Sequence, residues 1–285
     1  MALPSVALVT AVVVAIGLVA TCLLCLTAEQ VWLTIDTFDR RFASTAPYLA
    51  VAAVVFLLKW LTHDERLDLS YAIGWKMTDS IYAVEGTFVA VLQDFVPSSL
   101  YGFFSGIYMF GFSYLLFTAA VLTFVLPSQR SFKELLVAYL LNYSLGAVCY
   151  TLFVAYGPRN WIPSRVDGVL YDLYPQTQEV TAAVSAKTNV FPSLHTSLSV
   201  VVLLFAWRTH GTYPRWSSIA TFVASSVVLS TMVLGIHWLL DVVAGVVLGV
   251  GSVVAASRIV DRVEGGDPPT ASDDRPVTIR SETDD

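Results

Sequence analysis

The chain has 285 residues, of which 56% are hydrophobic and only 13% are charged. Soluble globular domains carry about 25% charged residues, so this composition excludes an ordinary soluble enzyme and indicates an integral membrane protein. The formal net charge of −6 excludes a nucleic-acid partner, because neutralising phosphates requires a basic surface.

Apolar runs that are long enough to cross a bilayer recur along the chain. A hydrocarbon core about 30 Å thick needs roughly 20 helical residues. The last apolar run is about twice that length, so we expect it to turn back at Gly235. The sequence therefore predicts an all-α, polytopic membrane bundle of about seven transmembrane helices. The runs lie at residues 4–26, 47–62, 100–126, 134–156, 191–207 and 216–257.

We group residues 1–62 as N-terminal transmembrane helices, because no basic segment precedes the first run and it resembles a retained helix. Residues 63–99 carry too many charges to cross. Their apolar residues recur at steps of three and four, which is typical of an amphipathic helix. We predict that this helix lies at the membrane interface, with packing against the bundle as the alternative. The apolar positions are Met77, Ile81, Val84, Phe88, Val91 and Phe95.

Counting the crossings places two histidines at one membrane face. The fifth crossing begins near His195, and the seventh begins near His237, so both share a side with the loop 157–190. Most Lys and Arg residues fall on the other side, which the positive-inside rule makes cytoplasmic. We therefore expect the histidines at the extracytoplasmic face of a prokaryotic plasma membrane. Residues 259–285 are predicted to be a disordered, acidic, cytoplasmic tail.

His237 and Asp241 are four residues apart, so they lie on one helical face. Ionisable groups in an apolar span are costly unless paired, which makes them functional candidates. An aspartate that accepts the Nδ1 proton of a histidine leaves Nε2 free to act as a nucleophile or base. The alternative is a pair that only pins two helices together.

His195 follows Pro192 and Ser193, which mark the start of a helix. Unpaired backbone amides at a helix N-terminus form an anion site that suits phosphate. The loop 157–190 offers positive charge for the same anion. Its basic residues, in order of preference, are Arg159, Lys187 and Arg165.

Two segments carry a resemblance to a known family. Residues 192–195 read P-S-L-H, and residues 230–241 read S-T-x5-H-x3-D. They resemble the motifs P-S-G-H and S-R-x5-H-x3-D of the type 2 phosphatidic acid phosphatase superfamily, and are most similar to its inositol phosphorylceramide synthase-like branch. The first family motif, K-x6-R-P, is not intact, because Arg159 is followed by Asn160 and no lysine precedes it at the required spacing.

The resemblance implies a six-helix phosphatase-type core within the bundle, a catalytic membrane region at residues 100–258 and a lipid phosphate as substrate. His237 would attack phosphorus and form a phosphohistidine, with Asp241 orienting it. His195 would protonate the leaving oxygen as general acid and then serve as base. A metal-independent phosphatase or phosphotransferase without a cofactor is expected, and transfer of a headgroup such as phosphoinositol between lipids is the alternative. The implied phosphate-binding residues are Arg159, Lys187 and Ser193.

Three other interpretations stay open. Two histidines and one carboxylate could form a facial metal triad, although nearby basic residues would repel a cation. The His237–Asp241 pair could serve a transporter or proton relay, or the chain could be an inactive structural relative. Separately, Gly245 and Gly249 predict a face of small residues for close helix packing.

Overall fold

The computed structural model describes residues 2–175 and 187–265, and almost all of its regular elements are helices. The predicted all-α fold class is therefore confirmed. The N-terminal half contains α1 (Ala2–Cys25), α2 (Ala28–Asp36), α3 (Phe38–Leu61), α4 (His63–Ile73), β1 (Trp75–Lys76), α5 (Thr78–Glu85), α6 (Phe88–Phe95), η1 (Ser98–Leu100), α7 (Tyr101–Gly106), the π-helix η2 (Ile107–Gly111) and α8 (Phe112–Val125).

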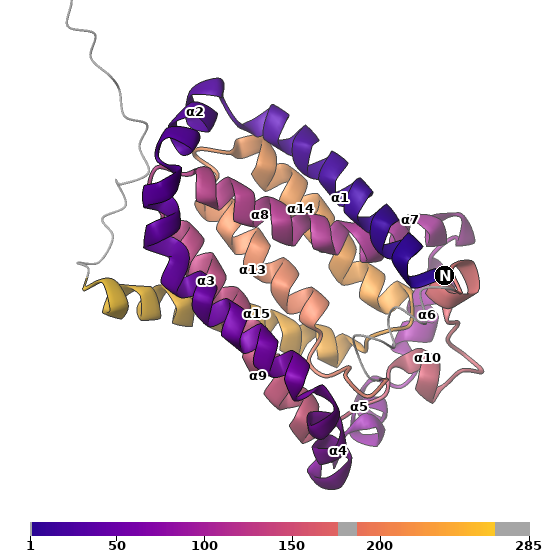
Figure 1. Ribbon diagram of the computed structural model, residues 1–285. Helices are drawn as coiled ribbons and strands as arrows, with labels where there is room; N and C mark the ends of the chain where they lie inside the picture. Colours follow the sequence, from indigo (N-terminus) through magenta and orange to yellow (C-terminus); the bar gives the residue numbers. More distant parts are fainter. Residues whose placement is uncertain (1, 176–186, 266–285) are drawn as a thin grey trace, which may run out of the picture.

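The C-terminal half supplies the centre of the bundle. Figure 1 shows α13 between α8 and α14 on one side and α9 and α15 on the other. Its elements are α9 (Arg130–Leu152), β2 (Phe153–Val154), α10 (Pro158–Trp161), α11 (Val169–Leu173), α13 (Leu194–Arg208), α14 (Pro214–Val233) and α15 (Leu239–Glu264).

Six helical stretches among the described residues are long and apolar enough to cross a membrane: α1, α3, residues 98–125, α9, α14 and α15. They agree with the predicted crossings apart from 191–207. That run forms α13, whose 15 residues extend about 22 Å. The protein is thus an integral membrane protein, and a seventh crossing stays a prediction. The predicted reversal at Gly235 is confirmed, because this residue adopts φ +65° between α14 and α15.

The small residues of α15 bring it against α13. A Cβ atom at Gly245 would lie 2.6 Å from the Ser193 carbonyl oxygen, and one at Gly249 would lie 2.5 Å from the Ser197 carbonyl oxygen. Neither position has space for a larger side chain, so the predicted close-packing face is confirmed. This contact sets how near the starts of α13 and α15 approach each other.

Ion pairs join the opposite ends of the same helices. The buried Glu134 of α9 lies 2.8 Å from the Arg130 guanidinium and 3.0 Å from that of Arg208, at the end of α13. Arg130 also pairs with Asp261 near the end of α15. His195 begins α13, so it lies at the end of the bundle remote from this cluster.

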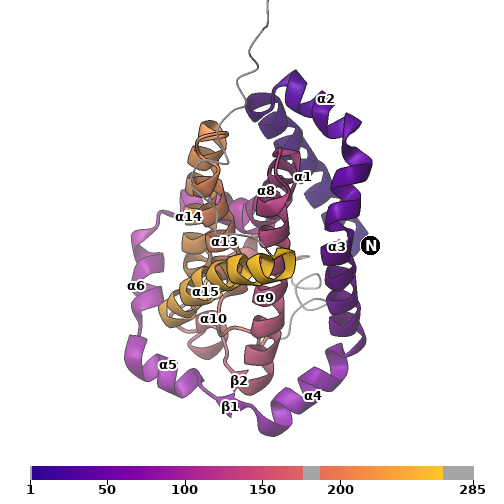
Figure 2. The same ribbon diagram turned by 90° about the vertical axis from the view of Figure 1, so that its left-hand side faces the viewer.

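The prediction of one amphipathic helix within residues 63–99 is wrong. The chain forms α4, β1, α5 and α6, with Gly86 at φ +58° separating α5 from α6. The predicted apolar stripe is divided accordingly: Ile81 is buried, whereas Val84 is 74% and Phe95 is 80% exposed. Figure 2 shows these elements following one another along one end and one side of the bundle. Their place at the membrane interface stays a prediction.

The C-terminal boundary also differs from the prediction. Helix α15 continues to Glu264, where Gly265 ends it in the left-handed conformation that glycine adopts easily. Residues 259–264 are therefore helical and do not belong to a disordered tail. Residues 266–285 lie outside the described part of the chain.

Candidate functional site

His237 lies in the turn 234–238 that joins α14 to α15. The backbone N–H groups of Ile236 and His237 both donate to the Thr231 carbonyl oxygen, at 3.0 Å each. Gly157 fits tightly beside this turn, because a Cβ atom there would lie 2.2 Å from the Ile236 carbonyl oxygen. The turn is thus fixed both by its own hydrogen bonds and by the neighbouring loop.

The structure brings His195 and His237 together, as the counting of crossings predicts. Their ring centroids are 6.5 Å apart. The backbone N–H of Ser193 donates to the Asp241 carbonyl oxygen at 3.0 Å, which ties the start of α13 to α15. His237 is only 4% exposed, and His195 is half-buried. The two imidazoles therefore lie next to each other at one end of the bundle.

Asp241 lies beside His237 and also caps α15. Its Oδ2 atom is 3.5 Å from His237 Nδ1 and accepts a hydrogen bond of 2.7 Å from the Trp238 backbone N–H. In the part of the chain that the structure describes, the His237 Nδ1 and Asp241 Oδ1 atoms have no hydrogen-bond partner. The pair is at ion-pair distance without a formed hydrogen bond, so a small rotation of either side chain would create one.

The environment of His237 favours its neutral form. Burial and, to a smaller extent, the positive charge of Arg159 lower the pKa of this imidazole to about 3, although a hydrogen bond with the Val190 backbone acts in the opposite direction. A neutral imidazole keeps the lone pair that a nucleophile needs.

Arg159 supplies the positive charge beside His237. Its Nη2 atom donates to the Tyr171 hydroxyl at 2.9 Å, and the guanidinium lies 4.4 Å from the centre of the Tyr171 ring. Its backbone N–H donates to the Gly235 carbonyl oxygen at 3.1 Å. The Nε and Nη1 atoms are buried and have no hydrogen-bond partner among residues 2–175 and 187–265. Unsatisfied buried donors are costly, so these two atoms are available for the oxygens of an anion.

The other predicted phosphate ligands differ in their placement. Ser193 is fully buried, and its Oγ accepts from the Thr196 N–H at 3.3 Å and from the Thr196 hydroxyl at 3.0 Å. Ser193 is thus the N-cap of α13, next to His195. Lys187 and Arg165 are exposed, and within the described residues no contact joins either of them to the histidines. The structure therefore gathers Arg159 and Ser193 at the site, but not Lys187 or Arg165.

Two aromatic residues that the sequence analysis did not assign enclose His195. The Tyr108 ring stacks on the imidazole with centroids 4.4 Å apart, and the Phe112 ring lies at 4.3 Å. Both come from the region where the π-helix η2 continues into α8, and such π-helical turns are frequent at functional sites. Their spacing of four residues indicates a shared helical face, but the sequence does not indicate which histidine they cover.

Glu85 and Gln93, which the sequence analysis did not assign to the site, contact the two helix ends beside the turn that carries His237. The Glu85 carboxylate accepts from the backbone N–H groups of Leu239 and Leu240. Burial raises the pKa of this carboxyl group, and the two hydrogen bonds counteract part of the rise. The Gln93 side chain donates to the Val233 carbonyl oxygen at 2.8 Å. No single-sequence signal indicates these partners, because they are distant along the chain.

Within residues 2–175 and 187–265, no three His, Cys, Asp or Glu side chains come close enough to hold a metal ion together. The positions of His195, His237 and Asp241 therefore lend no support to the facial-triad interpretation.

The comparison with known families gives a match. The family model described as the PAP2 superfamily matches residues 90–255, which is more than half of the chain. This range contains both histidines, Asp241 and Arg159. No curated protein and no solved structure matches the chain.

Proposed function

Because the chain belongs to the PAP2 superfamily, we propose that it is a lipid-phosphate phosphatase or phosphotransferase that acts through a phosphohistidine. Phosphatase-type activity follows from the family. One observation supports the finer proposal: the buried, unpartnered Nε and Nη1 atoms of Arg159 lie beside a neutral His237 that faces His195. This arrangement supports an anion site beside two imidazoles, one for attack on phosphorus and one for proton transfer.

In the proposed mechanism, His237 Nε2 attacks phosphorus while the bond from phosphorus to the leaving oxygen breaks. His195 donates a proton to that oxygen, which leaves as an alcohol. His195 then accepts a proton from water or an acceptor alcohol, whose oxygen attacks phosphorus and breaks the bond to nitrogen. Asp241 Oδ2, at 3.5 Å from Nδ1, stabilises the positive charge that develops on His237.

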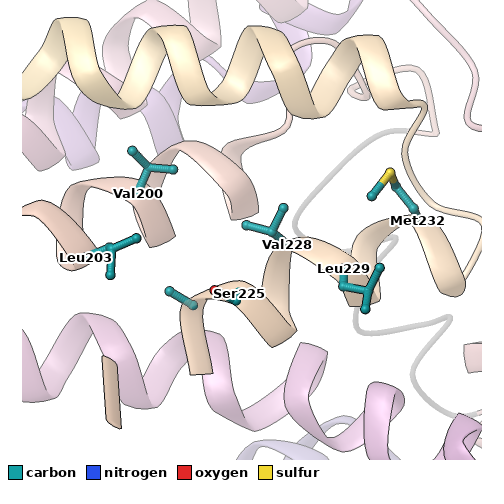
Figure 3. A pocket seen from close by; sticks show the side chains of 7 residues that line it. Val200, Leu203, Ser225, Val228, Leu229 and Met232 are labelled. Atoms are coloured by element: carbon teal, nitrogen blue, oxygen red, sulfur yellow. The ribbon is translucent and has the colours of Figure 1, made fainter. Parts of the chain in front are cut away.

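An apolar groove supports a lipid as the substrate. Figure 3 shows it between α13, which contributes Val200 and Leu203, and α14, which contributes Val228 and Met232. The groove has a volume of about 260 Å³ and is lined mainly by hydrocarbon side chains. Met232 lies near the end of α14, just before the turn that carries His237. A hydrocarbon chain in the groove would leave its phosphate close to the catalytic turn.

The location of the site supports action at the extracytoplasmic face of a prokaryotic plasma membrane. The ion-pair cluster around Glu134 and Arg208 lies at the end of the bundle remote from His195. The sequence places most basic residues on the side of that cluster, and the positive-inside rule makes this side cytoplasmic. The ionisable groups of the candidate site, His195, His237 and Asp241, lie together at one end of the bundle, whereas a proton relay would distribute such groups through the depth of the membrane.

The experiment uses purified protein in detergent micelles with radiolabelled phosphatidic acid or polyprenyl phosphate. We expect an acid-labile phosphohistidine that His237→Ala abolishes and whose formation His195→Ala slows. His210→Ala is the matched control, because His210 is exposed near the other end of α13, where it contacts Ser217 and stacks on Trp207. Adding an alcohol acceptor to the aqueous reaction then distinguishes hydrolysis, which releases phosphate, from transfer, which forms a new phosphate ester. Labelling that is unchanged in His237→Ala would refute the proposed nucleophile.

A further inference from the structure

The α5–α6 segment (residues 78–95) contacts the beginning of the helix that follows the catalytic turn. The Glu85 carboxylate accepts hydrogen bonds from the backbone N–H groups of Leu239, at 2.9 Å, and Leu240. These are the first two residues of α15, and their N–H groups have no partner within that helix. A side chain from another element thus satisfies them, and its negative charge suits the positive end of the helix.

The same segment also contacts the end of the helix that precedes the turn. Gln93 is 5% exposed, and its side-chain Nε2 donates to the Val233 carbonyl oxygen at 2.8 Å and to that of Asp167 at 3.1 Å. Its Oε1 accepts from the Asp167 N–H at 3.0 Å. Val233 is the last residue of α14. Gln93 therefore links the end of α14 to the loop that follows Arg159.

We infer that Glu85 and Gln93 are positioning residues that hold His237 from the two sides of its turn, an inference that rests on the proposed function. The turn is short, and its residue Gly235 leaves the backbone freer than any other residue would. The reaction requires His237 to keep its distance from both His195 and the phosphate within a fraction of an ångström. Neither positioning residue touches the reacting atoms.

The test compares Glu85→Ala and Glu85→Gln with Asp79→Ala, which removes an equal charge from an exposed position of the same helix. Glu85→Ala should lower kcat by about tenfold to 100-fold and leave KM within about twofold, because substrate contacts are retained. Glu85→Gln should recover part of the loss, since its amide oxygen still accepts a hydrogen bond. Asp79→Ala should match the wild type.

Hydrogen–deuterium exchange provides a readout that needs no turnover. Glu85→Ala should speed exchange at the Leu239 and Leu240 amides by about tenfold or more, whereas a peptide from α9 should exchange as in the wild type. Gln93→Ala, with the exposed Asp94→Ala as its control, repeats the kinetic comparison at the other side of the turn.

Unchanged exchange at these amides would overturn the contact, and faster exchange with unchanged kcat would overturn the positioning role. A wild-type protein without turnover on lipid phosphates would refute the proposed function instead. In that case the exchange measurement would still decide whether Glu85 holds the turn.

Discussion

Gly245→Ala tests whether close packing of α15 on α13 sets the geometry of the site. The added Cβ atom would lie 2.6 Å from the Ser193 carbonyl oxygen, where an ordinary contact begins at 3.4 Å. The two backbones must therefore separate by about 0.8 Å. Overpacking of this kind costs about 1–3 kcal/mol, while replacing a helical glycine with alanine returns about 0.5–1 kcal/mol. We expect a net loss of about 1–2 kcal/mol.

The separation also moves His195, two residues after Ser193, away from the α15 residues that support His237. A misplacement approaching 1 Å lowers activity by up to about 100-fold, so kcat should fall at least tenfold. Gly251→Ala is the matched control on the same helix, because nothing lies within 4 Å of its added Cβ atom. This substitution should be neutral or slightly stabilising.

The assays are thermal unfolding in detergent micelles and release of phosphate from a lipid phosphate. A loss of 1–2 kcal/mol corresponds to a Tm decrease of about 2–8 °C for a chain of this size. Gly251→Ala should keep or raise Tm and keep kcat. Equal Tm and kcat values for the Gly245→Ala and Gly251→Ala proteins would refute the argument that this contact positions the catalytic residues.

Two further predictions concern the charges of the site. Arg159→Ala should lower kcat by about 100-fold or more. Arg159→Lys should restore only part of the lost activity, because an ammonium group lacks the planar donor fork of a guanidinium. Release of phosphate measures both variants, and equal activity of Arg159→Ala and the exposed Arg165→Ala would contradict the assignment of Arg159 to the anion site. The pKa of His237 lies near 3 in the folded chain and near 6.5 when unfolded, so below pH 6.5 only the unfolded chain binds this proton. The contribution of this residue to the free energy of unfolding should therefore decline from pH 6.5 toward pH 3. On acidification, the Tm of His237→Gln should fall less steeply than the Tm of the wild type. Parallel profiles of Tm against pH would argue against a neutral, buried His237.

Much of the bundle follows from local features of the sequence. Apolar runs mark the membrane-spanning helices because burial in lipid requires unbroken hydrophobic length, and Gly235 marks the reversal because glycine adopts positive φ easily. The spacing of His237 and Asp241 places them on one helical face. Alternate crossing directions bring His195 to the same end of the bundle. Each inference depends on residues that are near one another along the chain, or on whether an odd or an even number of membrane crossings separates two segments.

Other features depend on residues that are far apart along the chain. The sequence offers Arg159, Lys187 and Arg165 as loop cations with Arg159 preferred, but only the fold shows that Arg159 lies beside His237. The error in residues 63–99 has a similar origin. A regular spacing of apolar residues does not reveal that Gly86 ends one helix or that Glu85 finds its partner 154 residues later.

The sequence by itself thus determined most of the membrane-spanning helices, the family motifs and the end of the bundle where the motifs meet. The tertiary structure decided which cation accompanies His237, which aromatic rings enclose His195 and which side chains hold the turn between α14 and α15. The physical reason is that hydrophobic length and helical spacing are encoded locally. The partners of a buried hydrogen-bonding group, by contrast, are set by which distant segments pack beside it.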